Sequence, residues 1–218
     1  MLILKQFDVE LVRLQKEDIE LVRQWRNAAH ITNNMIYREF ITPEMQERWF
    51  HSINNPYNYY FLIVFEGKKV GLINAKNYDP KTGFGEGGIF IGEQEFEPSF
   101  AAAYASLTLL NFVFYMLPHI QLSKIRILKE NSRAIQYNKL LGYECIGESE
   151  NGYDLIFELT KERFQSKGLK LNQAAALFSN GSSDMTLIGQ QSETLLPEIN
   201  RLLENNPSPM AIPGLQKL

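Results

Sequence analysis

The sequence predicts a mixed α and β fold, α/β in the broad sense and α+β in the narrow one. It has a mixed, largely antiparallel central sheet, helices on both of its faces and a small C-terminal extension. Two observations lead to this fold class. Pairs of apolar runs are joined by tight turns around Gly67 and around Asn151–Gly152, as in antiparallel hairpins. Later in the chain, a short capped helix stands between two strands, which indicates a crossover connection. Hairpins followed by a crossover are typical of a mixed sheet.

The first elements are a strand and two helices. Residues 9–14 are rich in branched apolar side chains and predict a strand. Residues 16–29 shift to a helical period, with apolar side chains at spacings of three on one face. Thr42 followed by Pro43 predicts the start of the second helix, because a hydroxyl can cap the first turn and proline fits the first helical position.

Three strands and a long helix come next. Residues 59–79 predict a hairpin, and residues 87–93 predict a third neighbouring strand. The segment from 100 to 117 contains no charged residue, and Ser99 can cap a helix there. Its 18 residues reach the lower limit for a membrane span. Because Pro118 follows at once and no cluster of Lys or Arg flanks the segment, a buried helix ended by this proline is the preferred interpretation.

The last elements of the main domain surround a helix at residues 131–142. A strand at 123–129 precedes it, and a final hairpin over 143–160 follows it. Asn131 can accept a hydrogen bond from a backbone N–H of the first turn, and Gly142 suits the left-handed position just past the last turn. These two residues predict both ends of the helix.

We divide the chain into a domain of residues 1–166 and a C-terminal extension of residues 167–218. The extension has a strand candidate at 185–188 and a helix candidate at 192–205. Its last residues contain three prolines and are typical of a disordered tail. No motif indicates what the extension does.

Composition excludes several classes of function. The 218 residues carry a net charge of −3 and a pI of about 5.7, so no basic surplus indicates nucleic-acid binding. The single cysteine, Cys145, excludes a disulfide within the chain and favours a reducing compartment. The first residues lack the apolar core and cleavage site of a signal peptide, and the 3 histidines show no metal-ligand spacing. We expect a cytoplasmic protein that holds no metal and binds neither nucleic acid nor membranes.

The segment ENSRAIQYNKLLGYE, residues 130–144, resembles the N-x-x-A-x-x-x-Y-x-x-x-G-F/Y segment of the GNAT superfamily of N-acetyltransferases. Four of its residues fall in register with that segment: Asn131, Ala134, Gly142 and Tyr143. The tyrosine departs from the pattern. Asn138 stands where the family has its tyrosine, and Tyr137 comes one residue early, which is about 100° round a helix.

Two further stretches extend the resemblance. Residues 12–31 (VRLQKEDIELVRQWRNAAHI) and 41–53 (ITPEMQERWFHSI) resemble the RimJ/RimL-type branch and, still more, bacterial enzymes that acetylate nucleotide-linked amino sugars. The resemblance implies transfer of an acetyl group from acetyl-CoA to a primary amine of a small molecule, by direct attack in a ternary complex. It covers residues 9–160 and leaves the extension outside.

The resemblance also implies two catalytic residues. Tyr137 would protonate the departing thiolate, and Glu86, at the start of the third strand, would take the proton of the amine. A structural interpretation stays open for each residue. Tyr137 can serve packing alone, and Glu86 can be a carboxylate at the edge of a turn.

Acetyl-CoA would lie along the third strand, beside the helix at 131–142, and with its diphosphate on the start of the uncharged helix, where free N–H groups attract an anion. The cofactor-binding residues that this implies are Ile89, Phe90, Ile91, Ala101, Ala102, Ala103, Asn131 and Asn138. The substrate-binding residues, from the first helix and the loop after it, are Arg26, Asn27, Tyr37 and Arg38. At the diphosphate site, Glu97 replaces the family's Gln or Arg and Phe100 replaces a glycine, so a carboxylate and a ring stand where the family has neither.

Two alternatives stay open. Glu97, Phe100 and Asn138 would also suit a non-catalytic binding or assembly module with a degenerate CoA phosphate loop, in which the extension supplies a homodimer contact or a partner surface. A domain that takes its acyl group from a carrier protein would depend less on diphosphate contacts. Binding of coenzyme A separates the enzyme from the non-catalytic module.

Overall fold

The computed structural model describes residues 2–79, 81–117, 119–189, 199, 202, 209–213 and 215. Its strands are β1 (Ile3–Phe7), β2 (Val9–Arg13), β3 (Tyr59–Phe65), β4 (Lys68–Asp79), β5 (Phe84–Ile91), β6 (Leu122–Leu128), β7 (Glu144–Glu148), β8 (Asp154–Thr160) and β9 (Ser182–Ile188). In the described part of the chain they form one sheet of 9 strands, in the order β7-β8-β6-β5-β4-β3-β2-β1-β9. Neighbours pair antiparallel except β5 and β6, which pair parallel. The predicted mixed, largely antiparallel sheet is therefore confirmed.

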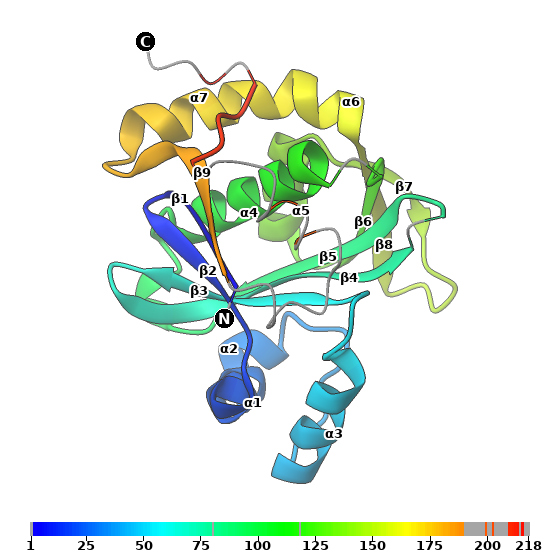
Figure 1. Cartoon of the computed structure of the whole chain (residues 1–218). Coiled ribbons are helices and arrows are strands. Elements are labelled where there is room, and N and C mark those ends of the chain that lie inside the picture. The colour runs from blue at the N-terminus through cyan, green and yellow to red at the C-terminus, as the bar shows by residue number, and fades with distance from the viewer. Residues whose placement is uncertain are drawn as a thin grey trace.

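Helices cover both faces of this sheet (Figure 1). The helices on one face are α1 (Ile19–Asn27), α2 (Ala29–Thr32) and α3 (Pro43–Ile53). Those on the other are α4 (Ala101–Asn111), α5 (Ser132–Leu141), α6 (Lys161–Arg163) and α7 (Leu169–Phe178). Short 3-10 turns at Lys16–Asp18 and Gln94–Phe96 precede α1 and α4, and wider π turns at Phe112–Met116 and Phe164–Gly168 follow α4 and α6.

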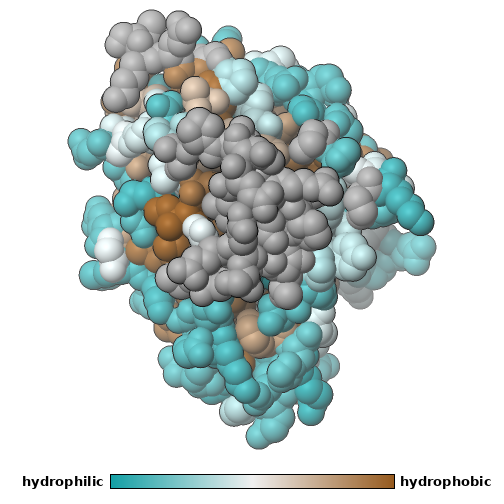
Figure 2. Space-filling view, viewed as in Figure 1, coloured by the Kyte–Doolittle hydropathy of each residue, from teal (hydrophilic) through white to brown (hydrophobic). Residues whose placement is uncertain are grey.

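Two apolar cores result from this layering. The larger core lies between the sheet and α4, and the smaller one lies under α1 and α3, where Trp25 and Phe50 meet Leu72 of β4. The outer side of α1 and α3 is mostly hydrophilic on the face that Figure 2 shows. This one-sided distribution agrees with the apolar stripe predicted for residues 16–29.

Local chemistry sets three element boundaries as the sequence predicts. The Thr42 side chain accepts a hydrogen bond from the Met45 N–H (3.3 Å), and Asn131 accepts one from the Ala134 N–H (3.0 Å). Gly142 ends α5 with a φ of +103°, in the left-handed region that glycine adopts without strain. The two capped helix starts and the glycine helix end are therefore confirmed.

The uncharged segment forms the buried centre of the molecule. Nine of the 11 residues of α4 are buried, and its chain continues through the π turn to Met116. The cap predicted at Ser99 is wrong, because α4 has Phe100 at its N-cap position and no side-chain cap there. Within the described residues, no helix is long and apolar enough to span a membrane. The prediction of a buried helix is confirmed, and its proposed end at Pro118 lies outside the described residues.

The C-terminal extension joins the same sheet. β9 contains the strand candidate 185–188 and pairs antiparallel with β1, a strand that the sequence pattern did not predict. The helical stretch from α6 through α7 was also missed. Met210 pairs with Met185 of β9, whereas most of the helix candidate 192–205 and much of the expected tail lie outside the described residues. The division at residue 166 stays a prediction.

Candidate active site

The sheet opens where β5 and β6 separate. Their parallel pairing covers only three residue pairs and ends at Glu86 and Lys124. On its other side, β5 stays paired with β4 as far as Ile91. Past Glu86, the backbone edge of β5 therefore faces a gap instead of a neighbouring strand. A cavity of about 1050 Å³ lies at this gap and is lined by residues of both strands.

The cavity is lined from both faces of the sheet. Side chains of β5 alternate between the faces. Phe90 packs against Trp25 of α1, with ring centroids 6.3 Å apart, so Glu86 faces the α1–α3 side as well. Ile89 packs into the larger core on the α4 side. Two reactants could thus approach the gap from opposite faces.

The α4 side of the cavity is lined by small side chains of this helix. Ala102, Ala103 and Ser106 line it. The predicted obstacle, Phe100, does not, because its ring stacks on Tyr104 (5.7 Å between centroids) and on Phe178 of α7 (6.5 Å). Phe100 is 59% exposed and does not line the cavity, whereas Ala102 and Ala103 of the first turn of α4 do.

The carboxylate at the helix start is neutralised from α5. Glu97 lies 3.4 Å from the Arg133 guanidinium, which also donates a hydrogen bond to the Glu97 carbonyl (2.8 Å). Both residues line the cavity. The negative charge of Glu97 is thus balanced by a residue 36 positions away. A diphosphate at this end would meet an ion pair instead of a lone carboxylate, so the chain's residues fit coenzyme A.

Tyr137 points at α4. Its hydroxyl donates a hydrogen bond to the Ala102 carbonyl (3.0 Å), while its ring packs against the larger core and still lines the cavity. Burial raises the pKa of this phenol above its ordinary value. The group is therefore a neutral proton donor at physiological pH, and the one-residue offset has not removed it from the cavity.

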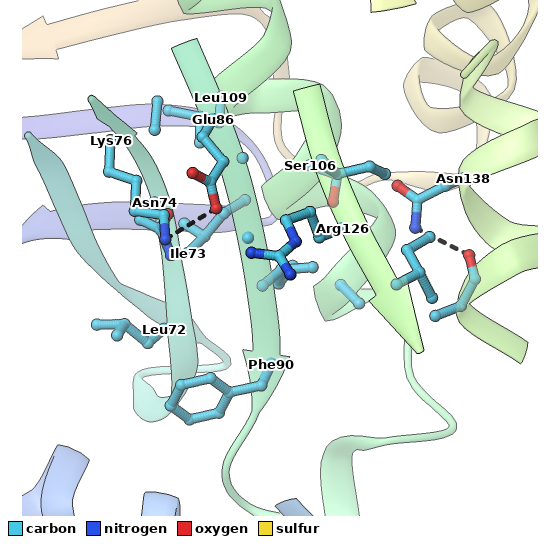
Figure 3. A pocket seen from close by; sticks show the side chains of 18 of the residues that line it. Leu72, Ile73, Asn74, Lys76, Glu86, Phe90, Ser106, Leu109, Arg126 and Asn138 are labelled. Carbon is cyan, nitrogen blue, oxygen red and sulfur yellow. Dashed lines mark hydrogen bonds and ion pairs between the residues drawn. The ribbon is translucent and has the colours of Figure 1, made fainter. Parts of the chain in front are cut away.

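Asn138 is held by its own helix. Its Nδ2 donates to the Ala134 carbonyl (2.8 Å), and the side chain lies at the cavity wall formed by α5 (Figure 3). Asn131 lines the cavity too, although its Oδ1 already caps α5. An amide at either position can donate or accept hydrogen bonds but cannot act as an acid.

Glu86 lies on the α1–α3 side of the cavity. Its carboxylate pairs with Lys76 of β4 (2.8 Å) and accepts a weaker bond from Asn77 (3.3 Å), as Figure 3 shows for the lysine. Burial and the nearby Glu86 charge raise the pKa of Tyr60 to about 12, although Arg26 lowers it in part. Glu86, Tyr60 and Arg26 all line this cavity.

Two of the predicted substrate-binding residues hold the loop before α3 instead of lining the cavity. Both amide atoms of Asn27 bond to the Ile41 backbone, at 2.9 and 2.8 Å. Arg38 pairs with Glu130 at the start of α5 (2.7 Å) and so ties this loop to the opposite wall. Arg26 and Tyr37 do line the cavity. Ala101 is fully buried and does not.

The structure therefore brings most of the predicted residues to one cavity. Those that line it are Arg26, Tyr37, Glu86, Ile89, Phe90, Ile91, Ala102, Ala103, Asn131, Tyr137 and Asn138. Sequence reasoning missed Asn74, Lys76, Ser106 and Arg126. For Asn74 and Lys76 a signal existed, because polar residues at alternate positions of an otherwise apolar strand mark one polar face.

Comparison with known proteins bears on this site. The family model for the acetyltransferase (GNAT) domain matches residues 11–155. No curated protein sequence matches significantly.

Solved structures share the fold. A domain from Methanocaldococcus jannaschii is 22% identical, with a TM-score of 0.61 over 71% of this chain and 99% of its own. Spermidine N-acetyltransferase from Vibrio cholerae, in complex with CoA and spermine, is 16% identical, with a TM-score of 0.62 over 72% of this chain and 98% of its own. FdhC, a nucleotide-linked sugar GNAT, is 16% identical, with a TM-score of 0.63 over 76% and 94%. At these identities the likeness shows the fold alone.

Proposed function

Because the chain belongs to the acetyltransferase (GNAT) domain family, we propose that it transfers an acetyl group from acetyl-CoA to the primary amine of a small molecule. One observation carries the proposal: the cavity opens through the sheet where β5 leaves β6, and it is lined from both faces. A thioester bound from the α4 side and an amine bound from the α1–α3 side would meet at this gap, which replaces a chance encounter by a positioned one.

The chain's own residues suit direct attack. Glu86 takes a proton from the bound ammonium, and the free amine nitrogen then bonds to the thioester carbon. The carbonyl electron pair moves to oxygen, where the unpaired backbone edge of β5 past Glu86 offers N–H donors. When the pair returns, the C–S bond breaks, and the thiolate accepts a proton from Tyr137, which must leave the Ala102 carbonyl to give it. The new amide nitrogen then loses its remaining extra proton, which neutralises the Tyr137 phenolate.

The finer assignment follows the sequence resemblance. The stretches at 12–31 and 41–53 favour the RimJ/RimL-type branch and a nucleotide-linked amino sugar as the acceptor. Tyr37, at the cavity wall, offers an aromatic face to a sugar or base. A nucleotide-linked acceptor and a single cysteine are both consistent with work in the cytoplasm.

One observation favours a second candidate, the non-catalytic module. The Tyr137 hydroxyl is already bonded to a backbone carbonyl, and the family's tyrosine position holds Asn138. If no other acid serves the thiolate, coenzyme A would bind without efficient turnover. The two candidates thus agree on coenzyme A and differ on the rate of acetyl transfer.

Two measurements test the proposal. Calorimetry with coenzyme A should give a dissociation constant in the micromolar range, and an absence of binding at about 1 mM ligand would end the enzyme proposal. Labelled acetyl-CoA, incubated with the protein and a panel of amines, should give a labelled amide by mass spectrometry. Binding without any labelled product would favour the non-catalytic module instead.

A further inference from the structure

The basic side chains around the cavity are paired with one exception. Four Lys or Arg residues line it, and three of them are matched by carboxylates: Lys76 with Glu86 (2.8 Å), Arg126 with Asp154 (2.6 Å) and Arg133 with Glu97 (3.4 Å). The fourth is Arg26 of α1. In the described part of the chain, Arg26 has no carboxylate partner, and both lining carboxylates are already used. The cavity therefore keeps one uncompensated positive charge, on its α1–α3 side.

The environment of Arg26 makes this charge costly. Burial lowers the pKa of its guanidinium, an effect that the nearby phenols of Tyr60 and Tyr37 partly oppose. Its Nε is buried and has no hydrogen-bond partner among the described residues. A partly buried guanidinium whose Nε–H has no partner among the described residues is unfavourable in the free protein, and an oxyanion would satisfy both its charge and this N–H group.

In the same cavity, Asn74 supplies a hydrogen-bond acceptor that has no donor among the described residues. Its Oδ1 is buried and accepts no hydrogen bond from the described residues. Its amide lies over Gly88 of β5, where an added Cβ would come within 3.0 Å of the Asn74 Nδ2. The glycine therefore leaves room for this amide on the face that carries Glu86.

We propose that the acceptor amine carries an oxyanion, a phosphate or a carboxylate, which Arg26 binds, and a hydroxyl or amino donor that bonds to the Asn74 Oδ1. We call these two residues the acceptor pair. The inference rests on the proposed function and names its substrate class. It disfavours polyamines, since their charges would add to that of Arg26 instead of neutralising it.

The native tryptophans can report binding on the α1–α3 side of the cavity. The 2 tryptophans of the chain are Trp25, next to Arg26 in α1, and Trp49, which lines the cavity from α3. Intrinsic fluorescence should therefore respond to an acceptor independently of turnover. We would titrate the whole chain with glucosamine, glucosamine 6-phosphate, glucosaminic acid, UDP-glucosamine and spermidine, which differ in oxyanion and charge.

At least one oxyanion-bearing amine should bind about tenfold or more tightly than glucosamine. Spermidine should bind more weakly than glucosamine. Arg26→Gln should remove this preference, whereas Arg26→Lys should keep part of it. The matched control is Arg48→Gln on the exposed side of α3, which changes the net charge equally and should bind as the wild type does. Circular dichroism melting would verify that each variant is folded.

The outcomes separate this inference from the proposed function. The substrate class is overturned if no oxyanion-bearing amine binds better than glucosamine, which lacks the oxyanion, or if Arg26→Gln and Arg48→Gln behave alike. A preference for phosphate over carboxylate, or the reverse, supports the inference and identifies the oxyanion. A wild type that binds these anions through Arg26 but neither binds coenzyme A nor acetylates an amine would contradict the proposed function alone.

Discussion

Two groups of polar side chains in this molecule are built in opposite ways. The first, which we call the amide cluster, joins Gln6 of β1, Asn111 of α4 and Asn172 of α7. Asn111 donates to Gln6 (3.0 Å) and to Asn172 (2.7 Å), and Asn172 donates back to Asn111 (3.2 Å). The second is the acceptor pair, where Arg26 Nε and Asn74 Oδ1 have no partner among the described residues.

The difference separates structure from function. A buried polar group must find a partner, and in the amide cluster the fold supplies it, which fastens the C-terminal extension to the central helix. In the acceptor pair the fold withholds it beside a cavity, so a ligand is the natural partner. Substitutions in the first group should therefore cost stability, and those in the second should cost binding.

The largest effect is expected from Asn111→Leu, which removes the centre of the amide cluster. The side chain is fully buried, and its loss leaves the Gln6 Oε1 and the Asn172 Oδ1 without the donor that they share. The free energy of unfolding should fall by about 3 kcal/mol. Urea denaturation followed by circular dichroism measures it.

Asn74→Leu is the matched control for this exchange. It also replaces an asparagine by leucine, but the Oδ1 that it removes accepts no hydrogen bond from the described residues. The free energy of unfolding should change by less than about 1 kcal/mol. Equal losses in the two variants would erase the distinction between the amide cluster and the acceptor pair.

The next effect concerns Glu86. Its ion pair with Lys76 suggests a structural role, whereas its position in the cavity suggests a catalytic one. Glu86→Gln should lower kcat by about 100-fold, because it removes the base. Its control is Glu158→Gln. Glu158 pairs with Lys124 at 2.6 Å and has a side chain 24% exposed, as Glu86 has, but it does not line the cavity. Steady-state kinetics should show full turnover in the control, and an equal loss in both variants would assign Glu86 to the fold.

Tyr137→Phe should have a smaller effect, near tenfold on kcat, with the affinity for coenzyme A unchanged. The residue is intermediate between the two groups, since its hydroxyl is bonded to Ala102 yet lines the cavity. Loss of that bond should also lower the free energy of unfolding by about 1 kcal/mol. Turnover equal to that of the wild type, together with this loss of stability, would make Tyr137 a structural residue.

The sequence predicted the fold best where one residue decides a boundary. Thr42, Asn131 and Gly142 act through bonds or dihedrals within a few positions, so their roles can be read locally. β1 was missed because its partner on one side is β9, nearly the whole chain away. The change in composition near residue 166 predicts the end of a domain, but the helical stretch after β8 runs across it.

The candidate site was predictable only in part, for a related reason. The resemblance of residues 130–144 indicated which helix and strands to consider, and most of the residues it implied line one cavity. Whether Arg26 or Asn74 keeps a partner depends on three elements that meet only in the fold. The balance of Glu97 by Arg133 depends on contacts between segments in the same way. No local sequence signal shows which side chains from distant segments will become partners.

The smallest effect is expected at Phe100, which tests whether the aromatic stack at the start of α4 belongs to the structure or to the site. Phe100→Ala should change the affinity for coenzyme A by less than about threefold, because the ring does not line the cavity. Phe178→Ala, which removes the outer ring of the stack, should give the same small change in calorimetry. Tenfold tighter binding in Phe100→Ala alone would mean that the ring occupies the diphosphate position, and that the start of α4, unlike the acceptor pair, is closed to its ligand by the fold.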